Sequence, residues 1–126
     1  MAGITYDTGV LIAAERGDRR VWALHRRSLE RGMVPTVPAG VLAQSWRGGP
    51  QHQMSRLLSG CRIEPLNEAR ARSAGVACGA AGSSDVVDAS VVVGAASRGD
   101  LVLSSDGRDL ARLRDALDVE VRLQIL

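Results

Sequence analysis

The sequence contains no lysine and no phenylalanine, and its aromatic side chains are limited to one tyrosine and two tryptophans. All 16 basic residues are therefore arginines, which excludes any mechanism that needs a catalytic lysine. With so few aromatic rings, the core must be built from Val, Leu, Ile and Ala. A hydrophobic fraction of 45% is ordinary for a globular chain. We expect one domain over residues 1–126.

Long apolar runs and cysteine motifs are also missing. No segment approaches the roughly 20 apolar residues that cross a bilayer, and no secretion signal is recognisable, so we expect a cytoplasmic protein without a membrane segment. Cys61 and Cys78 have neither CxxC spacing nor a nearby histidine cluster, which favours a structural role for both. His25 and His52 lie in polar helical contexts and are expected at the surface. The net charge of +2 is compatible with a nucleic-acid substrate without indicating one.

Apolar periodicity and turn residues predict alternating strands and helices. We expect strands at 3–6, 33–37, 62–66, 101–103 and 119–123, and helices at 10–14, 19–31, 39–46, 51–58, 68–80, 85–98 and 107–117. The prolines near the second strand favour an early or edge position in the sheet. This alternation indicates an α/β domain with a central, mostly parallel sheet of about five strands and helices on both faces.

Three aspartates are placed where such a fold gathers ligands. Asp7 and Asp106 each follow a predicted strand, and ligands collect at the carboxyl ends of parallel strands. Asp88 lies on the apolar stripe of its predicted helix, where a carboxylate is costly unless a cation or hydrogen bond meets it. Taken one at a time, each of three acids also has a structural explanation: helix capping for Asp7 and Asp106, and the helix dipole for Asp85. Together, clustered carboxylates indicate a Mg²⁺ or Mn²⁺ site that assists phosphodiester hydrolysis.

The ordered set of motifs resembles the PIN-domain family and, within it, the VapC-like ribonuclease toxins of bacterial toxin–antitoxin pairs. The resemblance covers essentially the whole chain. It is carried by YDTGVLIAAERGD at 6–18, VPAGVLAQSWRGG at 37–49, SSDVVDASVVVGAASRGD at 83–100 and LVLSSDGRDLARL at 101–113. It implies a PIN-like three-layer sandwich and a Mg²⁺- or Mn²⁺-dependent endoribonuclease that cuts RNA. It also implies a VapB-like antitoxin partner, docked in a groove formed partly by the early helices, and a homodimer.

The resemblance assigns roles to individual residues. Asp7, Asp88 and Asp106 match the acids that would hold the metal, and Asp85 is an extra acid near Asp88 that would act with them in catalysis. Three hydroxyl side chains beside these acids could orient water or the metal: Thr8, Ser104 and Ser105. Caps and turns explain the two serines about as well.

Position 44 departs from the family pattern. PIN nucleases usually carry Glu in the helix after the second strand, whereas this chain reads Ala43-Gln44-Ser45-Trp46. Gln44 accepts a hydrogen bond through its carbonyl but brings no negative charge. Three interpretations follow. In the first, which we favour, Gln44 is natural in a subgroup of the family where Asp85 supplies the missing negative charge. In the second, Gln44 is an engineered Glu→Gln change. The third interpretation is a PIN-like domain with weak or lost nuclease activity that binds RNA or an antitoxin.

Two other patterns carry less functional information. The basic run Arg16, Arg19, Arg20, Arg26 and Arg27 is better explained as a solvated helix face than as a phosphate track. A phosphoacceptor or phosphatase α/β domain would also place Asp after the first strand. Because those domains generally need a lysine near the phosphoryl group, the lack of lysine argues against this class.

Overall fold

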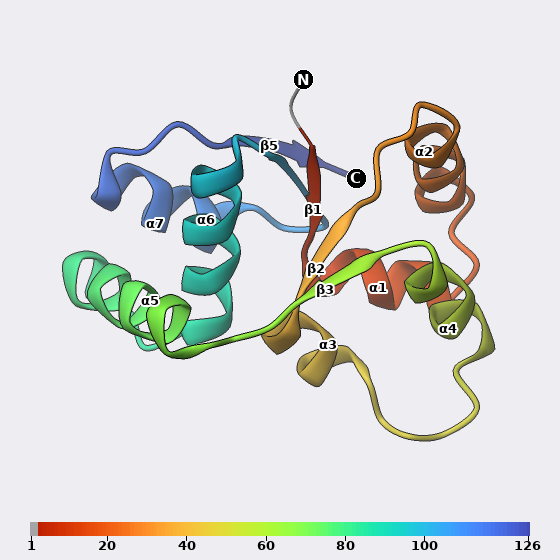
Figure 1. The fold of residues 1–126 in the computed structure, drawn as a ribbon, viewed down its shortest axis with the longest axis horizontal. Helices are drawn as coiled ribbons and strands as arrows, with labels where there is room; N and C mark the ends of the chain where they lie inside the picture. The colour runs from red at the N-terminus through yellow and green to blue at the C-terminus, as the bar shows by residue number, and fades with distance from the viewer. Residues whose placement is uncertain (1–2) are drawn as a thin grey trace.

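The protein is built around a five-stranded parallel sheet. The computed structural model describes residues 3–126, and the strand order is β3-β2-β1-β4-β5. The strands are β1 (Ile4–Tyr6), β2 (Thr36–Pro38), β3 (Arg62–Glu64), β4 (Leu101–Ser104) and β5 (Arg122–Ile125). Every pairing is parallel, with Thr5 opposite both Thr36 of β2 and Val102 of β4. The first strand in the chain is therefore the middle strand of the sheet (Figure 1).

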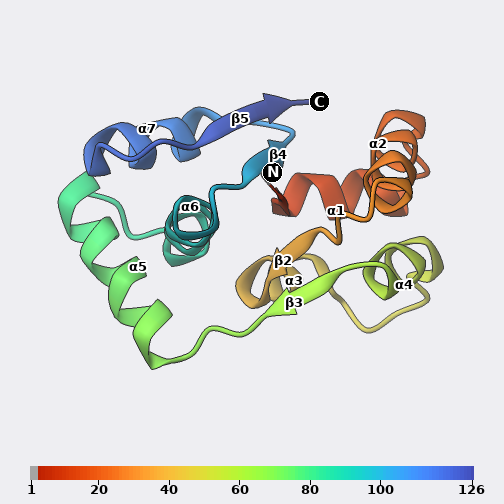
Figure 2. The ribbon, with the colours of Figure 1, turned by 45° about the horizontal axis from the view of Figure 1, so that its top comes forward.

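Two groups of helices cover the sheet and complete a three-layer α/β fold, as the sequence predicted. One group contains α1 (Thr8–Glu15), α2 (Arg19–Glu30), α3 (Ala39–Ser45) and α4 (His52–Ser59). The other contains α5 (Glu68–Ala81), α6 (Val86–Arg98) and α7 (Arg108–Leu117). Helices contact one another mainly within their own group, and Figure 2 shows the sheet running between the two groups.

The core is aliphatic, as the lack of aromatic residues required. Val37, Val102 and Leu103 from the strands are fully buried, together with Leu11 of α1 and Val91 of α6. Their neighbours are almost all Val, Leu and Ala, whose burial stabilises the fold by about 25 cal/mol per Å² of apolar surface. Both faces of the central strands are covered, which explains their short continuous apolar runs.

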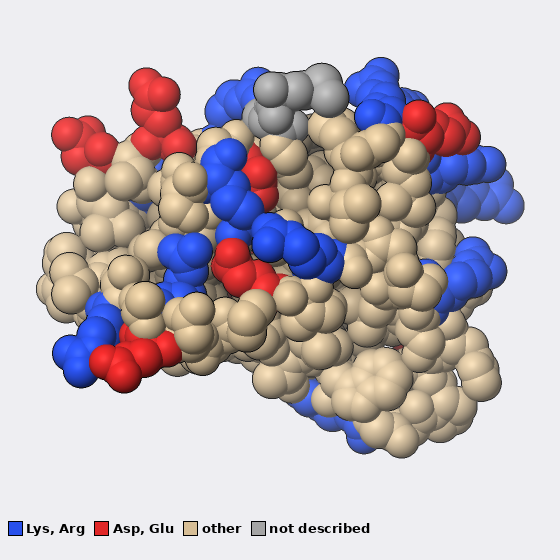
Figure 3. All heavy atoms as spheres, viewed as in Figure 1, with Lys and Arg blue, Asp and Glu red and all other residues tan. Residues whose placement is uncertain are grey.

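A buried ion cluster joins strands and helices on the α5–α6 side of the sheet. The Thr5 hydroxyl donates to Asp100 at 2.8 Å, and the Arg98 Nε donates to the same carboxylate at 2.9 Å. Arg98 also pairs with Glu64, which lies 3.6 Å from Arg70. Figure 3 shows basic and acidic side chains interspersed at the middle of this face. Because the acidic and basic side chains neutralise one another, the cluster does not form a patch of one charge. Its hydrogen bonds and ion pairs connect β1 to β3 and α6.

The position of β2 differs from the sequence-based expectation. The strand begins at Thr36, three residues later than predicted, and it lies between β1 and β3 instead of at an edge. Pro35 precedes the strand, and its carbonyl accepts the Arg62 N–H at 2.8 Å. Pro38 ends the strand and occupies the N-cap of α3. The prolines therefore bound a short inner strand, where a missing N–H costs no ladder bond.

The range of the last strand and one burial prediction were also wrong. The last strand is Arg122–Ile125 instead of 119–123, because Asp118 ends α7 in a left-handed conformation and the chain reaches the sheet edge only later. His25 is 4% exposed, not on the surface, and its Nδ1 shares a 2.9 Å hydrogen bond with the Tyr6 hydroxyl. His52 is exposed as expected. Cys78 is buried and Cys61 partly buried, and both are free thiols.

Candidate acidic site

The candidate site lies at the carboxyl ends of β1 and β4. Asp7 follows β1 directly and Asp106 comes two residues after β4. Because the two strands are parallel neighbours, both acids leave the same edge of the sheet. The first turn of α6 supplies the remaining pair: Asp85 is its N-cap and Asp88 lies within that turn.

Asp7 is the most buried member of the site, with 8% of its surface exposed. It occupies the N-cap position of α1, but its side chain makes no capping hydrogen bond. Instead, its Oδ2 accepts the Ser104 hydroxyl at 3.0 Å. Burial raises the pKa of the Asp7 carboxyl, and the charges of Asp85 and Asp106 add to this effect. Capping alone therefore does not explain why Asp7 points inward.

Asp88 and Asp85 form a close pair at the start of α6. The Asp85 Oδ1 accepts the backbone N–H of Asp88 at 3.0 Å, so Asp85 is a genuine helix cap. Burial, together with the charges of Asp85 and Asp7, raises the pKa of the Asp88 carboxyl from 3.8 to about 7. The structure thus brings Asp7, Asp85 and Asp88 into mutual electrostatic contact.

Asp109, which was not predicted as a site residue, belongs to the same neighbourhood. Its charge is a further cause of the raised pKa of Asp88. Asp109 and Asp85 line a polar cavity of about 290 Å³, together with Arg112. The available sequence signal was its position in the first turn of the helix that follows Asp106.

Asp106 lies at the rim of the site and is held by a local partner. Its side chain is 58% exposed and forms two hydrogen bonds with the Arg108 guanidinium, at 3.2 and 3.0 Å. These bonds lower the pKa of the Asp106 carboxyl. Asp106 is therefore adjacent to the buried acids, but its charge is partly neutralised by Arg108.

The polar residues expected beside the acids lie at the site mouth. The Thr8 hydroxyl donates to the Gln44 Oε1 at 2.7 Å, which joins the first residue of α1 to α3. Ser105 packs directly over Gly9: a Cβ at Gly9 would lie 1.9 Å from the Ser105 Oγ. Glycine is needed at this position because the loop after β4 approaches α1 so closely.

The donor chemistry of this site fits a divalent cation. Within residues 3–126, no group of three or more His, Cys, Asp or Glu side chains is already arranged to hold a metal ion. The oxygen atoms of clustered carboxylates are nevertheless the ligands that Mg²⁺ and Mn²⁺ select. Burial is the main cause of the raised pKa values of Asp7 and Asp88, and the neighbouring carboxylates add to it, so a bound cation would favour the ionised forms of both acids.

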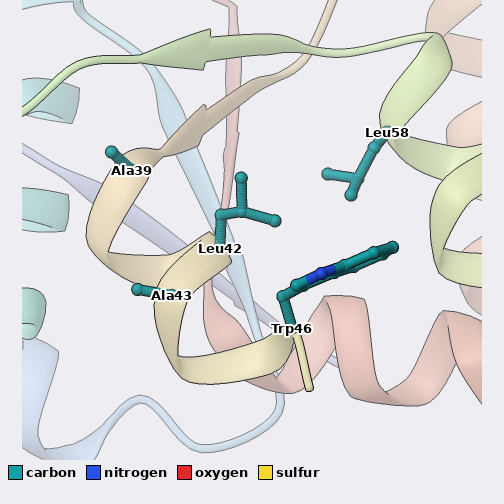
Figure 4. Close-up of a pocket in the computed structure, with 5 residues that line it drawn as sticks. All are labelled: Ala39, Leu42, Ala43, Trp46 and Leu58. Atoms are coloured by element: carbon teal, nitrogen blue, oxygen red, sulfur yellow. The ribbon is translucent and has the colours of Figure 1, made fainter. Parts of the chain in front are cut away.

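A separate apolar groove lies between α3 and α4. Its volume is about 550 Å³, and it is lined by Ala39, Leu42, Ala43, Trp46 and Leu58. In Figure 4 the ring of Trp46, which directly follows α3, and the Leu58 side chain of α4 border the same space. Trp46 remains 40% exposed. Large exposed aromatic residues at such grooves are typical of protein-binding surfaces.

No single helix in the described part of the chain is long and apolar enough to cross a membrane. The α5 and α6 helices pass by length and composition only as a pair, and that pair is bent by 109°.

Comparison with known proteins identifies the fold through structure, not sequence. No protein-family model matches the chain, and no curated protein matches it. Among solved structures, the chain is similar to VapBC2 from Rickettsia felis bound to a DNA fragment from their promoter. The TM-score is 0.69 with 13% sequence identity, and the match covers 98% of each chain.

Proposed function

Because the chain has a VapC-like PIN fold, we propose that it is a metal-dependent endoribonuclease. The observation that carries this proposal is the buried acid Asp7, grouped at the end of the central strand with Asp85 and Asp88. A buried carboxylate group with raised pKa values is costly for stability, so its presence at an open sheet end indicates function.

The proposed chemistry assigns a role to each acid. Asp7, Asp88 and Asp106 would hold Mg²⁺ or Mn²⁺, with Asp85 fixing the backbone of Asp88 and adding negative charge. The bound ion would supply an activated water and neutralise charge on the phosphodiester. Ser104 positions Asp7 through its 3.0 Å hydrogen bond. Asp106 would have to exchange its Arg108 contacts for the cation.

Metal binding and RNA cleavage together test this proposal. Calorimetric titration with Mn²⁺ should show binding to the parent protein and its loss in Asp88→Asn. The same variant should no longer cut RNA while keeping the parent circular dichroism spectrum. Asp115→Asn changes an exposed acid of α7 and serves as the matched control. RNA cleavage that persists in a folded Asp88→Asn variant would refute the nuclease assignment.

A binding module without nuclease activity is the alternative function. Gln44 supports it, because the chain has an uncharged side chain where PIN nucleases usually carry Glu. RNA binding by the parent protein without Mn²⁺ binding or cleavage would select this alternative. If Gln44→Glu then bound Mn²⁺ and cut RNA, position 44 would be the cause of the lost activity.

We also propose a VapB-like antitoxin as a protein partner. The similar solved structure is named as a VapBC2 assembly, and the apolar groove with Trp46 offers a surface for a partner segment. Trp46→Ala should weaken such a complex without changing Mn²⁺ binding. The homodimer implied by the family resemblance is a proposal too, and sedimentation equilibrium of the isolated chain would test it. The cytoplasmic location stays a prediction.

A further inference from the structure

Helix α3 places Gln44 between the two helices that carry the acids. At the start of α3, a Cβ at Gly40 would lie 3.1 Å from the Val87 Cγ2, so α3 packs against the first turn of α6 next to Asp88. Gln44 lies four residues later, on the same face of α3 as Gly40. There it meets Thr8, which directly follows Asp7. Gln44 therefore stands at the entrance to the acidic site.

The hydrogen bond with Thr8 fixes the orientation of the Gln44 amide. The Thr8 hydroxyl donates to the Oε1 at 2.7 Å, which occupies the carbonyl side of the amide. The Nε2 side carries two hydrogens, and within residues 3–126 no hydrogen bond from this nitrogen to the protein is found. The side chain is exposed. Two oriented donors are thus presented to whatever enters the site.

These donors suit an anionic ligand and not a metal. A cation cannot bind an amide nitrogen that carries two hydrogens, whereas a phosphodiester oxygen accepts hydrogen bonds from it. A glutamate at this position would instead add a negative charge beside Asp7, Asp85 and Asp88, and would repel the RNA backbone. The uncharged Gln44 amide avoids the repulsion between a glutamate and the RNA backbone, and its N–H groups attract the phosphate oxygens.

We propose that Gln44 is a substrate-contacting residue whose Nε2 donates to a backbone phosphate oxygen of the bound RNA. This inference rests on the proposed function, because it needs RNA at the acidic site. It gives Gln44 a role that is distinct from metal binding: the acids hold the cation, while Gln44, oriented by Thr8, holds the substrate next to it.

Separate measurements of RNA affinity and Mn²⁺ affinity test the inference. We would titrate the full chain and its variants into a fluorescent random-sequence RNA oligonucleotide with 2′-O-methyl groups, and verify on gels that the RNA stays intact. Mn²⁺ binding would be measured by calorimetry without RNA. The variants are Gln44→Ala and Gln44→Glu, with Gln124→Ala and Gln124→Glu as controls. Gln124 is an exposed glutamine of the edge strand β5.

Gln44→Ala should bind RNA about tenfold more weakly, as expected for the loss of one hydrogen bond to a charged group, with Mn²⁺ affinity unchanged. Gln44→Glu should bind RNA more weakly still and Mn²⁺ more tightly. Both Gln124 variants should match the parent protein. Parental RNA affinity in Gln44→Ala, with Mn²⁺ binding intact, overturns this inference alone. A parent protein that binds neither Mn²⁺ nor RNA overturns the proposed function, and this inference falls with it.

Discussion

Replacing Asp88 by asparagine should stabilise the metal-free protein while abolishing its metal binding. Burial holds the pKa of Asp88 near 7, against an ordinary value of 3.8. At roughly 1.4 kcal/mol per pKa unit, ionising this group in the folded protein costs at most about 4 kcal/mol. Because the side chain is only partly buried, solvent screening reduces the expected gain to on the order of 1–2 kcal/mol.

The sign of this effect depends on pH. The folded pKa lies above the unfolded pKa, so the stabilising contribution is fully present below about pH 4 and is lost as the pH rises through about 7. Urea denaturation in EDTA should therefore show a lower free energy of unfolding at about pH 8 than at about pH 5. Asp88→Asn should reduce this difference and should exceed the parent stability at the higher pH.

The exposed acid Asp115 provides the comparison for this experiment. Its pairing with Arg114 lies on the surface of α7, so Asp115→Asn should leave the pH dependence of unfolding unchanged. The reasoning would be refuted if the metal-free parent protein were equally stable at both pH values. It would also be refuted if Asp88→Asn were less stable than the parent at the higher pH.

Three further substitutions test contacts around the site. Arg108→Ala frees Asp106 from its two hydrogen bonds and should tighten Mn²⁺ binding a few-fold by calorimetry; unchanged or weaker binding would contradict this role. Gly9→Ala places a methyl group 1.9 Å from the Ser105 Oγ. It should lower the free energy of unfolding in urea by about 1–3 kcal/mol, and a more stable variant would contradict the close approach. Tyr6→Phe removes the partner of the buried His25 ring and should lower the free energy of unfolding by about 1–3 kcal/mol; an unchanged urea midpoint would disprove the importance of this bond.

Local patterns were sufficient to predict most elements of the fold. The Asn67 cap and the glycine after Ala81 bound α5 close to its predicted range, because capping side chains and left-handed glycines act within a few residues. The alternation of strands and helices also predicted the parallel sheet and its two helical layers. The strand order was not predictable in this way, since β1 also pairs with β4, where Ile4 lies opposite Leu101 from a distant part of the sequence.

The site was predictable in outline and not in detail. Spacing after the strands located Asp7 and Asp106, and the position of Asp88 on an apolar stripe indicated its burial. The pairing of Asp106 with Arg108 depends on side-chain conformation in one turn, and no sequence pattern distinguishes it from a metal ligand. The burial of His25 depends on Tyr6 lying beneath α2, which is a tertiary contact between a strand and a helix.

β1 leaves the ribosome before the other four strands of this sheet, yet it occupies the middle of the finished sheet. Its register with β4 joins Ile4 to Leu101 and Tyr6 to Leu103, so β4 must be synthesised before this pairing exists. The Ser104 hydroxyl that holds Asp7 arrives with the same strand. A nascent chain that ends before β4 therefore lacks the strand that fixes Asp7, and the acidic site is assembled only after β4 has been synthesised.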